Sequence, residues 1–98
     1  MSAPVLDPLI HPVGRLQIFA VLTSAEEAEF SMVRDAVGVS DSVLSKHVKA
    51  LEDAGYVRVR KAASAGRQRT WLAITPRGRG AFSGHIAELT RLAGLVSQ

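Results

Sequence analysis

The strongest constraint on the fold is a change of hydrophobic period at Gly55. Before it, three apolar residues recur at the spacing of one helix face: Leu44, Val48 and Leu51. After it, apolar and polar residues alternate along 56–60 and again along 69–74, with the small residues of 62–66 between the two runs. This pattern predicts a helix over 41–54, followed by an antiparallel hairpin with a flexible loop at its tip.

Two shorter elements and a helix are predicted before this unit. Apolar residues between 12 and 23 cover more than one stripe, so this helix should be buried on two sides, facing the core and a partner subunit. A brief strand is expected at 29–31, and Ser31 can cap a two-turn helix over 32–37. Gly38 can end that helix in the left-handed conformation.

Cap signals mark the starts of two more helices. Ser40 can cap the third helix, and Thr75 followed by Pro76 predicts a last helix over 76–98. That helix carries apolar residues at heptad-like spacing: Phe82, Ile86, Leu89, Ala93 and Val96. Three glycines weaken its first half by up to about 1 kcal/mol each relative to alanine, so it needs to be buried against something. We expect a dimer interface there, with packing as one more core helix as the alternative.

Charge is distributed unevenly along the 98 residues. Residues 1–53 hold eight acids and four bases, a net charge of −4, and residues 54–98 hold one acid and eight bases, a net charge of +7. Together they give the formal charge of +3 of the whole chain. No acidic residue occurs between Asp53 and Glu88. A basic half in a chain of modest total charge indicates an anionic partner that binds in one place.

Composition narrows the class of protein further. There is no cysteine, which excludes disulfides, thiolate metal sites and cysteine nucleophiles and suits a reducing cytoplasm. The most apolar segment, 13–22, contains Arg15 and has about half the length of a membrane span. We expect His11, His47 and His85 to lie far apart, which argues against a metal site. No nucleophile set and no glycine-rich phosphate loop is present, so we expect no catalysis and no cofactor.

The helices over 32–37 and 41–54 form a helix-turn-helix pattern, and the basic hairpin after them would be a wing. Four polar residues share one stripe of the second helix: Ser42, Ser45, Lys46 and Lys49. A second helix of this kind inserts its N-terminal part into the major groove of DNA. The wing carries five basic residues that would bind phosphates: Arg58, Arg60, Lys61, Arg67 and Arg69. Arg67, near the tip, can reach the minor groove.

Some of these residues have a second interpretation. The polar stripe is also consistent with a solvated helix face, and the same surface could dock a protein and never touch DNA. His47 suits packing and a phosphate contact equally well, because it lies beside the apolar face of its helix. We expect Tyr56 and Trp71 to pack in the core of the hairpin rather than to stack on bases.

The run SVLSKHVKALEDAGYV, the basic hairpin and the run WLAITPRGRGAF together resemble winged helix-turn-helix transcriptional regulators of the MarR and ArsR type. The resemblance extends over residues 8–90. It implies a single α+β domain over 1–98, with a three-helix core, a hairpin wing and a C-terminal helix. It also implies a homodimer, formed by the terminal helices, that binds pseudo-palindromic double-stranded DNA near a promoter and usually represses. The groove contacts it implies are Ser42, Ser45, Lys46 and Lys49, with wing contacts around Arg67.

The chain departs from both types of regulator. It has no cysteine on the predicted recognition helix, unlike the ArsR metal sensors. It also lacks the long extra helices that form the usual ligand pocket of MarR proteins. A small-molecule effector of unknown identity, bound between the dimer helices, is a further expectation, and the sequence names no ligand.

Overall fold

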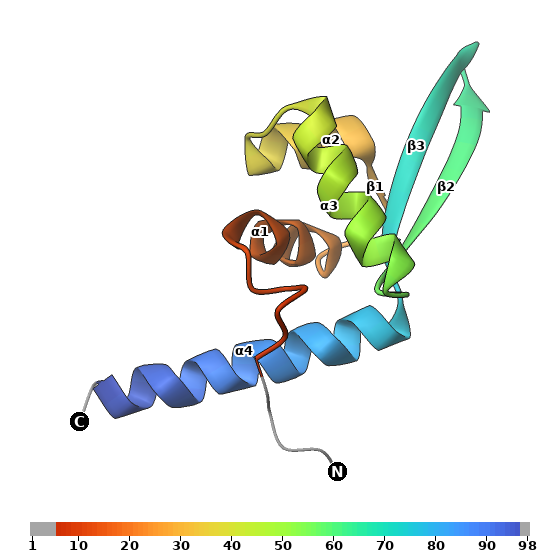
Figure 1. The fold of residues 1–98 in the computed structure, drawn as a ribbon. Helices are drawn as coiled ribbons and strands as arrows, with labels where there is room; N and C mark the ends of the chain where they lie inside the picture. The colour runs from red at the N-terminus through yellow and green to blue at the C-terminus, as the bar shows by residue number, and fades with distance from the viewer. Residues whose placement is uncertain (1–5, 97–98) are drawn as a thin grey trace.

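The computed structural model describes residues 6–96, which form four helices and a three-stranded antiparallel sheet (Figure 1). The elements are α1 (Val13–Leu22), β1 (Ala28–Glu29), α2 (Phe30–Val37), α3 (Asp41–Asp53), β2 (Val57–Ser64), β3 (Arg67–Ile74) and α4 (Pro76–Val96). The strand order is β1-β3-β2, so the hairpin of β2 and β3 is extended at its base by the short β1. The predicted α+β winged helix-turn-helix fold is confirmed.

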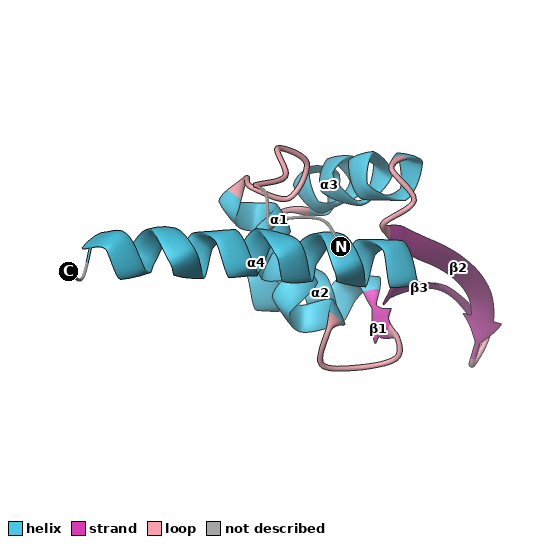
Figure 2. Ribbon diagram, turned by 90° about the horizontal axis from the view of Figure 1, so that it is seen from below, coloured by secondary structure: helices cyan, strands magenta, loops and turns pink. Residues whose placement is uncertain are grey.

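The molecule is elongated, with extents of 55 × 28 × 21 Å. Figures 1 and 2 show why: α4 runs across the base of the domain and continues past it, while the hairpin rises from the other end. The predicted last helix over 76–98 is seen as far as Val96, and its last two residues lie outside the described part of the chain. No helix among residues 6–96 is both long and apolar enough to cross a membrane.

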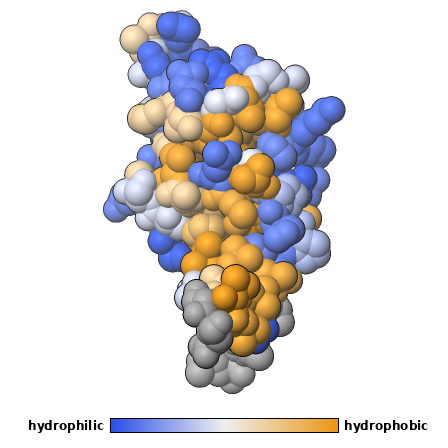
Figure 3. Space-filling model, turned by 90° about the vertical axis from the view of Figure 1, so that its left-hand side faces the viewer, coloured by the Kyte–Doolittle hydropathy of each residue, from blue (hydrophilic) through white to orange (hydrophobic). Residues whose placement is uncertain are grey.

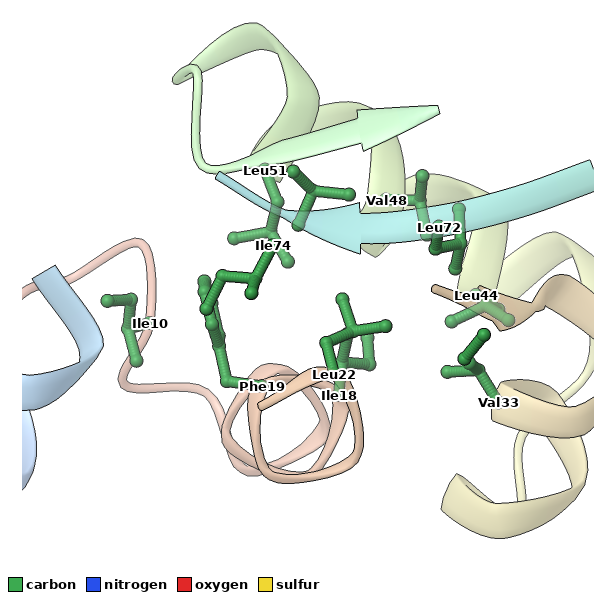
Figure 4. Packing of buried hydrophobic residues seen from close by; sticks show 12 residues of the cluster. Ile10, Ile18, Phe19, Leu22, Val33, Leu44, Val48, Leu51, Leu72 and Ile74 are labelled. Carbon is green, nitrogen blue, oxygen red and sulfur yellow. The ribbon is translucent and has the colours of Figure 1, made fainter. Parts of the chain in front are cut away.

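One hydrophobic core joins the first three helices to the base of the sheet (Figure 4). The apolar face of α3 points into it as predicted, with Leu44 and Leu51 fully buried and Val48 nearly so. The other fully buried apolar residues are Ile10, Ile18, Phe19, Leu22, Val33 and Leu72. Burying a side chain of this size contributes roughly 1.5–3 kcal/mol, so the core fixes the orientation of α3 about its own axis.

The start of α2 differs from the prediction. The helix begins at Phe30 rather than at residue 32, and Ser31 does not cap it. The Ser31 hydroxyl instead donates to Oε1 of Glu29 (3.1 Å). Glu29 is paired with Trp71 across the sheet, so the chain leaves β1 and turns at once into the helix. The predicted end is confirmed, because Gly38 has a φ of +78°.

The hairpin has a tighter tip than the predicted flexible loop. Both strands continue through the small residues as far as the pair Ser64 and Arg67. Only two residues make the turn, and both have positive φ: +53° at Ala65 and +76° at Gly66. Two left-handed residues are the geometry that matches the right-handed twist of a hairpin. The wing is therefore a regular ladder almost to its end.

The start of α4 fits against the end of α3 through small residues. The Thr75 hydroxyl accepts from the backbone N–H of Gly78 (3.0 Å), which confirms the predicted cap, and donates to the carbonyl of Gly55 (2.6 Å). A Cβ on Gly78 would lie 2.1 Å from the carbonyl oxygen of Tyr56. Gly78 is therefore required for this packing and does more than weaken the helix.

The segment before α1 is attached to α4 through His85. The backbone N–H of Asp7 donates to Nδ1 of the fully buried His85 (2.8 Å), and the Tyr56 hydroxyl donates to the Asp7 carboxylate (2.6 Å). The rings of His11 and His85 lie 5.5 Å apart, so the expectation that the three histidines are distant is wrong for this pair. Their closeness follows from the packing of the N-terminal segment on α4. Among residues 6–96, no three metal-binding side chains come together.

Candidate nucleic-acid interface

The four residues that are predicted to contact the DNA groove lie on the outer face of α3, which we call the recognition helix. Ser42, Ser45, Lys46 and Lys49 are all exposed, opposite the buried stripe of the same helix. The helix is fixed at its start because Ser40 Oγ accepts from the backbone N–H of Val43 (3.2 Å), as predicted. Nζ of Lys49 lies 3.4 Å from the Asp53 carboxylate. Both side chains are well exposed, so this salt bridge is weak and Lys49 can leave it to bind another anion.

The basic residues of the wing divide between its two faces. Cross-strand pairing places Arg58, Arg60, Arg67 and Arg69 on the face that points away from the recognition helix. Lys61 lies on the other face, with Val59 and Thr70. Because side chains alternate along a strand, the sequence predicts that the basic residues fall into these two sets. Which set faces the recognition helix depends on where α3 packs against the sheet.

A cleft of about 490 Å³ separates the recognition helix from the wing. Its sides are Ser45 and Lys49 on the helix and Lys61 and Thr70 on the wing. Val48 and Val59 are among the apolar residues that line it. The cleft is open. Lys49 and Lys61 place a positive charge on each of its two sides, and the acidic residues Asp41 and Glu52 also line it on the helix side.

Two of the predicted wing cations are bound to carboxylates. Nε and Nη2 of Arg60 donate to Glu27 (2.9 and 2.8 Å), and Nη1 of Arg69 donates to Glu29 (2.8 Å). The hydrogen bond from Arg60 lowers the pKa of the Glu27 carboxyl, with a smaller contribution from the charge of Arg58. These ion pairs join the wing to β1 and to the segment before it, an arrangement that the alternation pattern alone does not contain.

Arg67 and Lys61 differ from those two cations. Within residues 6–96 neither has a carboxylate within ion-pair distance. Both are exposed, Arg67 as the first residue of β3 beside the turn and Lys61 toward the cleft. An exposed cation without an internal partner is available to an anionic ligand.

The comparison with known proteins gives the family. A family model described as a winged helix DNA-binding domain matches residues 14–93. The chain belongs to the winged helix DNA-binding domain family. An uncharacterised protein of Methanocaldococcus jannaschii is 34% identical over 85 residues, which are 87% of this chain and 92% of that protein.

Solved structures of this winged helix architecture are similar over most of the chain. A transcriptional regulator homologue from Pyrococcus horikoshii OT3 has a TM-score of 0.85 at 24% identity, covering 92% of this chain and 89% of that one. A protein described as a MarR-family transcriptional regulator from Enterococcus faecalis V583 has a TM-score of 0.74 at 19% identity, covering 92% and 80%. These similarities show the winged helix fold that the resemblance in the sequence implied.

Arg34 fixes the turn of this winged helix domain, a role that was not predicted from the sequence. Its Nη1 donates to Asp41 at the start of the recognition helix (2.9 Å), and its Nε donates to Asp35 (3.0 Å). The hydrogen bonds that Arg34 donates to Asp41 and Asp35 raise its pKa, so it stays a cation held inside the motif. The seven-residue separation of Arg34 and Asp41 across a glycine turn is a signal that could have identified the pair.

His47, for which two roles were open, packs against the start of α1. Its Nδ1 accepts from Nε of Arg15 (3.1 Å), and its Nε2 lies 2.9 Å from where a Cβ of Gly14 would be. Burial lowers the pKa of His47, and the charge of Arg15 lowers it further. Tyr56 and Trp71 are both half-buried; Tyr56 packs against the core, whereas the Trp71 ring lies under the guanidinium of Arg60 at 5.7 Å.

Proposed function

We propose that this protein is a sequence-specific, double-stranded DNA-binding transcriptional repressor that acts as a homodimer in the cytoplasm. The observation that carries the proposal is the division of α3 into two stripes. One stripe is buried in the core and the other presents two hydroxyls and two ammonium groups to solvent: Ser42, Ser45, Lys46 and Lys49. A major groove is wide enough to take such a helix, and these groups can bond base edges and phosphates.

The wing supplies affinity that does not depend on sequence. Lys61 faces the cleft, and Arg67 stands beside the turn, from where it can reach the minor groove. Arg58 adds a third exposed cation. For Arg60 and Arg69 the phosphate role stays a prediction that requires each to exchange its carboxylate for a phosphate. For non-specific affinity, the proposal therefore relies on Lys61, Arg67 and Arg58.

Apolar surface supports the proposed dimer. Ile86 is 40% exposed, Leu95 60% and Val96 86%, all on α4. Figure 3 shows apolar surface extending from the middle of one side of the domain down to the projecting end of α4. Phe82 is half-buried and its ring stacks on Phe19 at 5.2 Å within the same chain, so its part in the interface stays a prediction. The proposed interface is the rest of the predicted seam: Ile86, Leu89, Ala93 and Val96.

Repression would follow from occlusion of a promoter by the bound dimer. A small-molecule effector that releases DNA is supported only by the resemblance to MarR regulators, and it belongs to the proposal on that ground alone. Both points depend on a DNA site, so the first experiment is to find one.

The test is a selection of bound fragments from random and genomic duplex DNA, followed by affinity measurements on the selected site. Ser45→Ala and Lys49→Ala should weaken binding to the selected site more than binding to random duplex. Arg67→Ala should weaken both and lower the salt dependence by about one unit. Equal losses on all sequences for every variant would contradict the groove assignment.

The alternative is a winged helix that docks a protein and does not bind DNA. The acid-free stretch between Asp53 and Glu88 fits an acidic protein as well as it fits DNA. Sequence preference on duplex DNA separates the two functions, because a surface evolved for an acidic protein has no reason to distinguish base pairs.

A further inference from the structure

One guanidinium without an acidic partner lies against the recognition helix. Arg15, in the first turn of α1, donates from Nε to Nδ1 of His47 (3.1 Å) and from Nη1 to the carbonyl of Leu9 (3.1 Å). Within residues 6–96, no carboxylate lies within ion-pair distance of it. Arg15 differs in this from four other arginines, each of which is bound to an acid: Arg34, Arg60, Arg69 and Arg91.

The environment of Arg15 holds the cation in place without neutralising it. His47 accepts at Nδ1, so this nitrogen carries no proton and the imidazole is neutral in this arrangement. Gly14 lets the ring approach the helix closely, since a Cβ there would be 2.9 Å from Nε2 of His47. The side chain of Arg15 is half-buried, and its remaining N–H groups meet no acceptor among residues 6–96.

The position of Arg15 complements that of the wing. Ser45 and Lys49 line the cleft on the wing side of the recognition helix, whereas His47 contacts α1 on the other side. Figure 1 shows α1 on one side of α3 and the wing on the other. Two phosphate backbones border the major groove, so a helix inserted there has a row of anions on each flank. The wing cations face one row, and Arg15 is placed to face the other.

We propose that Arg15, held by His47, binds a backbone phosphate on the flank of the recognition helix opposite the wing. This inference rests on the proposed DNA-binding function. Arg15 touches the ligand, and His47 is a positioning residue. The pair gives the domain electrostatic contacts on both sides of the groove, which fixes the tilt of the recognition helix without reading a base.

The experiment measures duplex affinity from about 50 to 200 mM salt, for the selected site and for random DNA. Arg15→Gln keeps a donor toward His47 and removes the charge. One lost phosphate contact should lower the salt slope by about 0.9 and weaken both complexes roughly fivefold near physiological salt. Arg91→Gln, which removes a charge at the far end of α4, should leave the slope unchanged. His47→Ala should weaken binding less than Arg15→Gln, because the charge remains but is no longer held.

Arg67→Ala separates the failure of this inference from failure of the function. If Arg67→Ala lowers the slope and Arg15→Gln does not, Arg15 does not bind phosphate and the inference is overturned while DNA binding stands. If the unmodified protein shows no salt-dependent duplex binding, both are overturned. Circular dichroism checks that each variant is folded. If Arg15→Gln does not fold, Arg15→Lys takes its place: it should keep the wild-type slope, and a lowered slope would overturn the proposal.

Discussion

At the scale of single residues, Gly78 shows how one missing Cβ decides a junction. The first turn of α4 rests on the backbone of Tyr56, and the distance of 2.1 Å to a Cβ leaves no room for any side chain. The contact is with a backbone carbonyl, which cannot rotate away as the end of a flexible side chain can. The glycines of this helix are therefore not equivalent, although they look alike in the sequence.

Gly78→Ala should destabilise the fold by about 1–3 kcal/mol, because the helix must shift and loosen the cap made by Thr75. Gly80→Ala is the matched control. No atom lies within 4 Å of its Cβ position, so alanine there should be neutral or should stabilise by up to about 1 kcal/mol. Urea denaturation of both variants gives the comparison, and equal effects would contradict the account of the junction.

His85 is the second residue whose role depends on long-range packing. Its Nδ1 accepts a hydrogen bond from Asp7, and its Nε2 is buried without an acceptor. Burial lowers the pKa of His85, and the charge of His11 lowers it further, while the Asp7 carboxylate acts in the opposite direction. Protonation would put a hydrogen on Nδ1, opposite the N–H of Asp7, so the attachment of the N-terminal segment requires the neutral ring.

Stability should therefore fall as the pH drops below about 6.5, the ordinary pKa of histidine. In that range the unfolded chain binds a proton at His85 and the folded chain does not, so unfolding becomes easier by up to about 1.4 kcal/mol per pH unit. His85→Gln keeps an acceptor for Asp7 but does not titrate. The free energy of unfolding of this variant should vary less with pH than that of the unmodified protein. The measurement runs from about pH 7.5 to about pH 5, the range in which histidine titrates. Identical pH curves would show that His85 is not the group responsible.

At the scale of elements, the sequence predicts what repeats locally. The buried stripe of α3, the glycine that ends α2 and the alternation of β2 and β3 all follow from residues close together in the chain. The same locality placed Ser42, Ser45, Lys46 and Lys49 on one exposed stripe. The tip of the wing was mispredicted because small residues favour a loop, whereas the ladder holds them in strands as far as Ser64. Cross-strand pairing overrode the local preference.

Contacts between distant segments could not be predicted. Arg69 and Glu29 are 40 residues apart, and Arg15 and His47 are 32 apart, so no spacing rule connects them. Each pair exists because the core brings two elements together. As a result, the sequence identified the basic residues of the wing but not which of them are already bound to acids.

The wing should depend on Glu29 for its position. The ion pair of Glu29 with Arg69 is mostly buried, with 23% and 32% of the side chains exposed, so Glu29→Gln should cost about 1–2 kcal/mol of stability. Glu27→Gln, at the more exposed pair with Arg60, is the control and should have a smaller effect. Denaturation curves test the stability, and hydrogen exchange at β3 tests the position. A larger loss for Glu27→Gln would contradict this order.

At the scale of the whole molecule, α4 extends further than the core can cover. Its 21 residues span about 31 Å, and its last turns carry exposed leucine and valine side chains. Contiguous apolar surface on a small monomer is a liability for aggregation unless a partner covers it. This is the physical reason for expecting two copies, and the over-apolar first helix of the sequence points the same way.

Light scattering should give twice the chain mass of 10.5 kDa at micromolar concentration. Ile86→Glu should shift the protein toward monomer and weaken binding to a palindromic site more than to a half-site. Met32→Glu is the control, since Met32 is 60% exposed on α2, away from the proposed interface. A species of 10.5 kDa for the unmodified protein would end the dimer proposal.

The turn at the tip of the wing has a consequence for how the protein meets its ligand. Ala65 occupies a left-handed conformation that costs an L-residue roughly 1–2 kcal/mol, and asparagine or glycine is the usual occupant. The strain lies at the far end of the ladder, where no core residue opposes it. The hairpin therefore opens from its tip first, and the pair Ser64 and Arg67 is the first to exchange with solvent. In the proposed complex with DNA, Arg67 can thus change direction to follow the width of a groove while the recognition helix stays fixed.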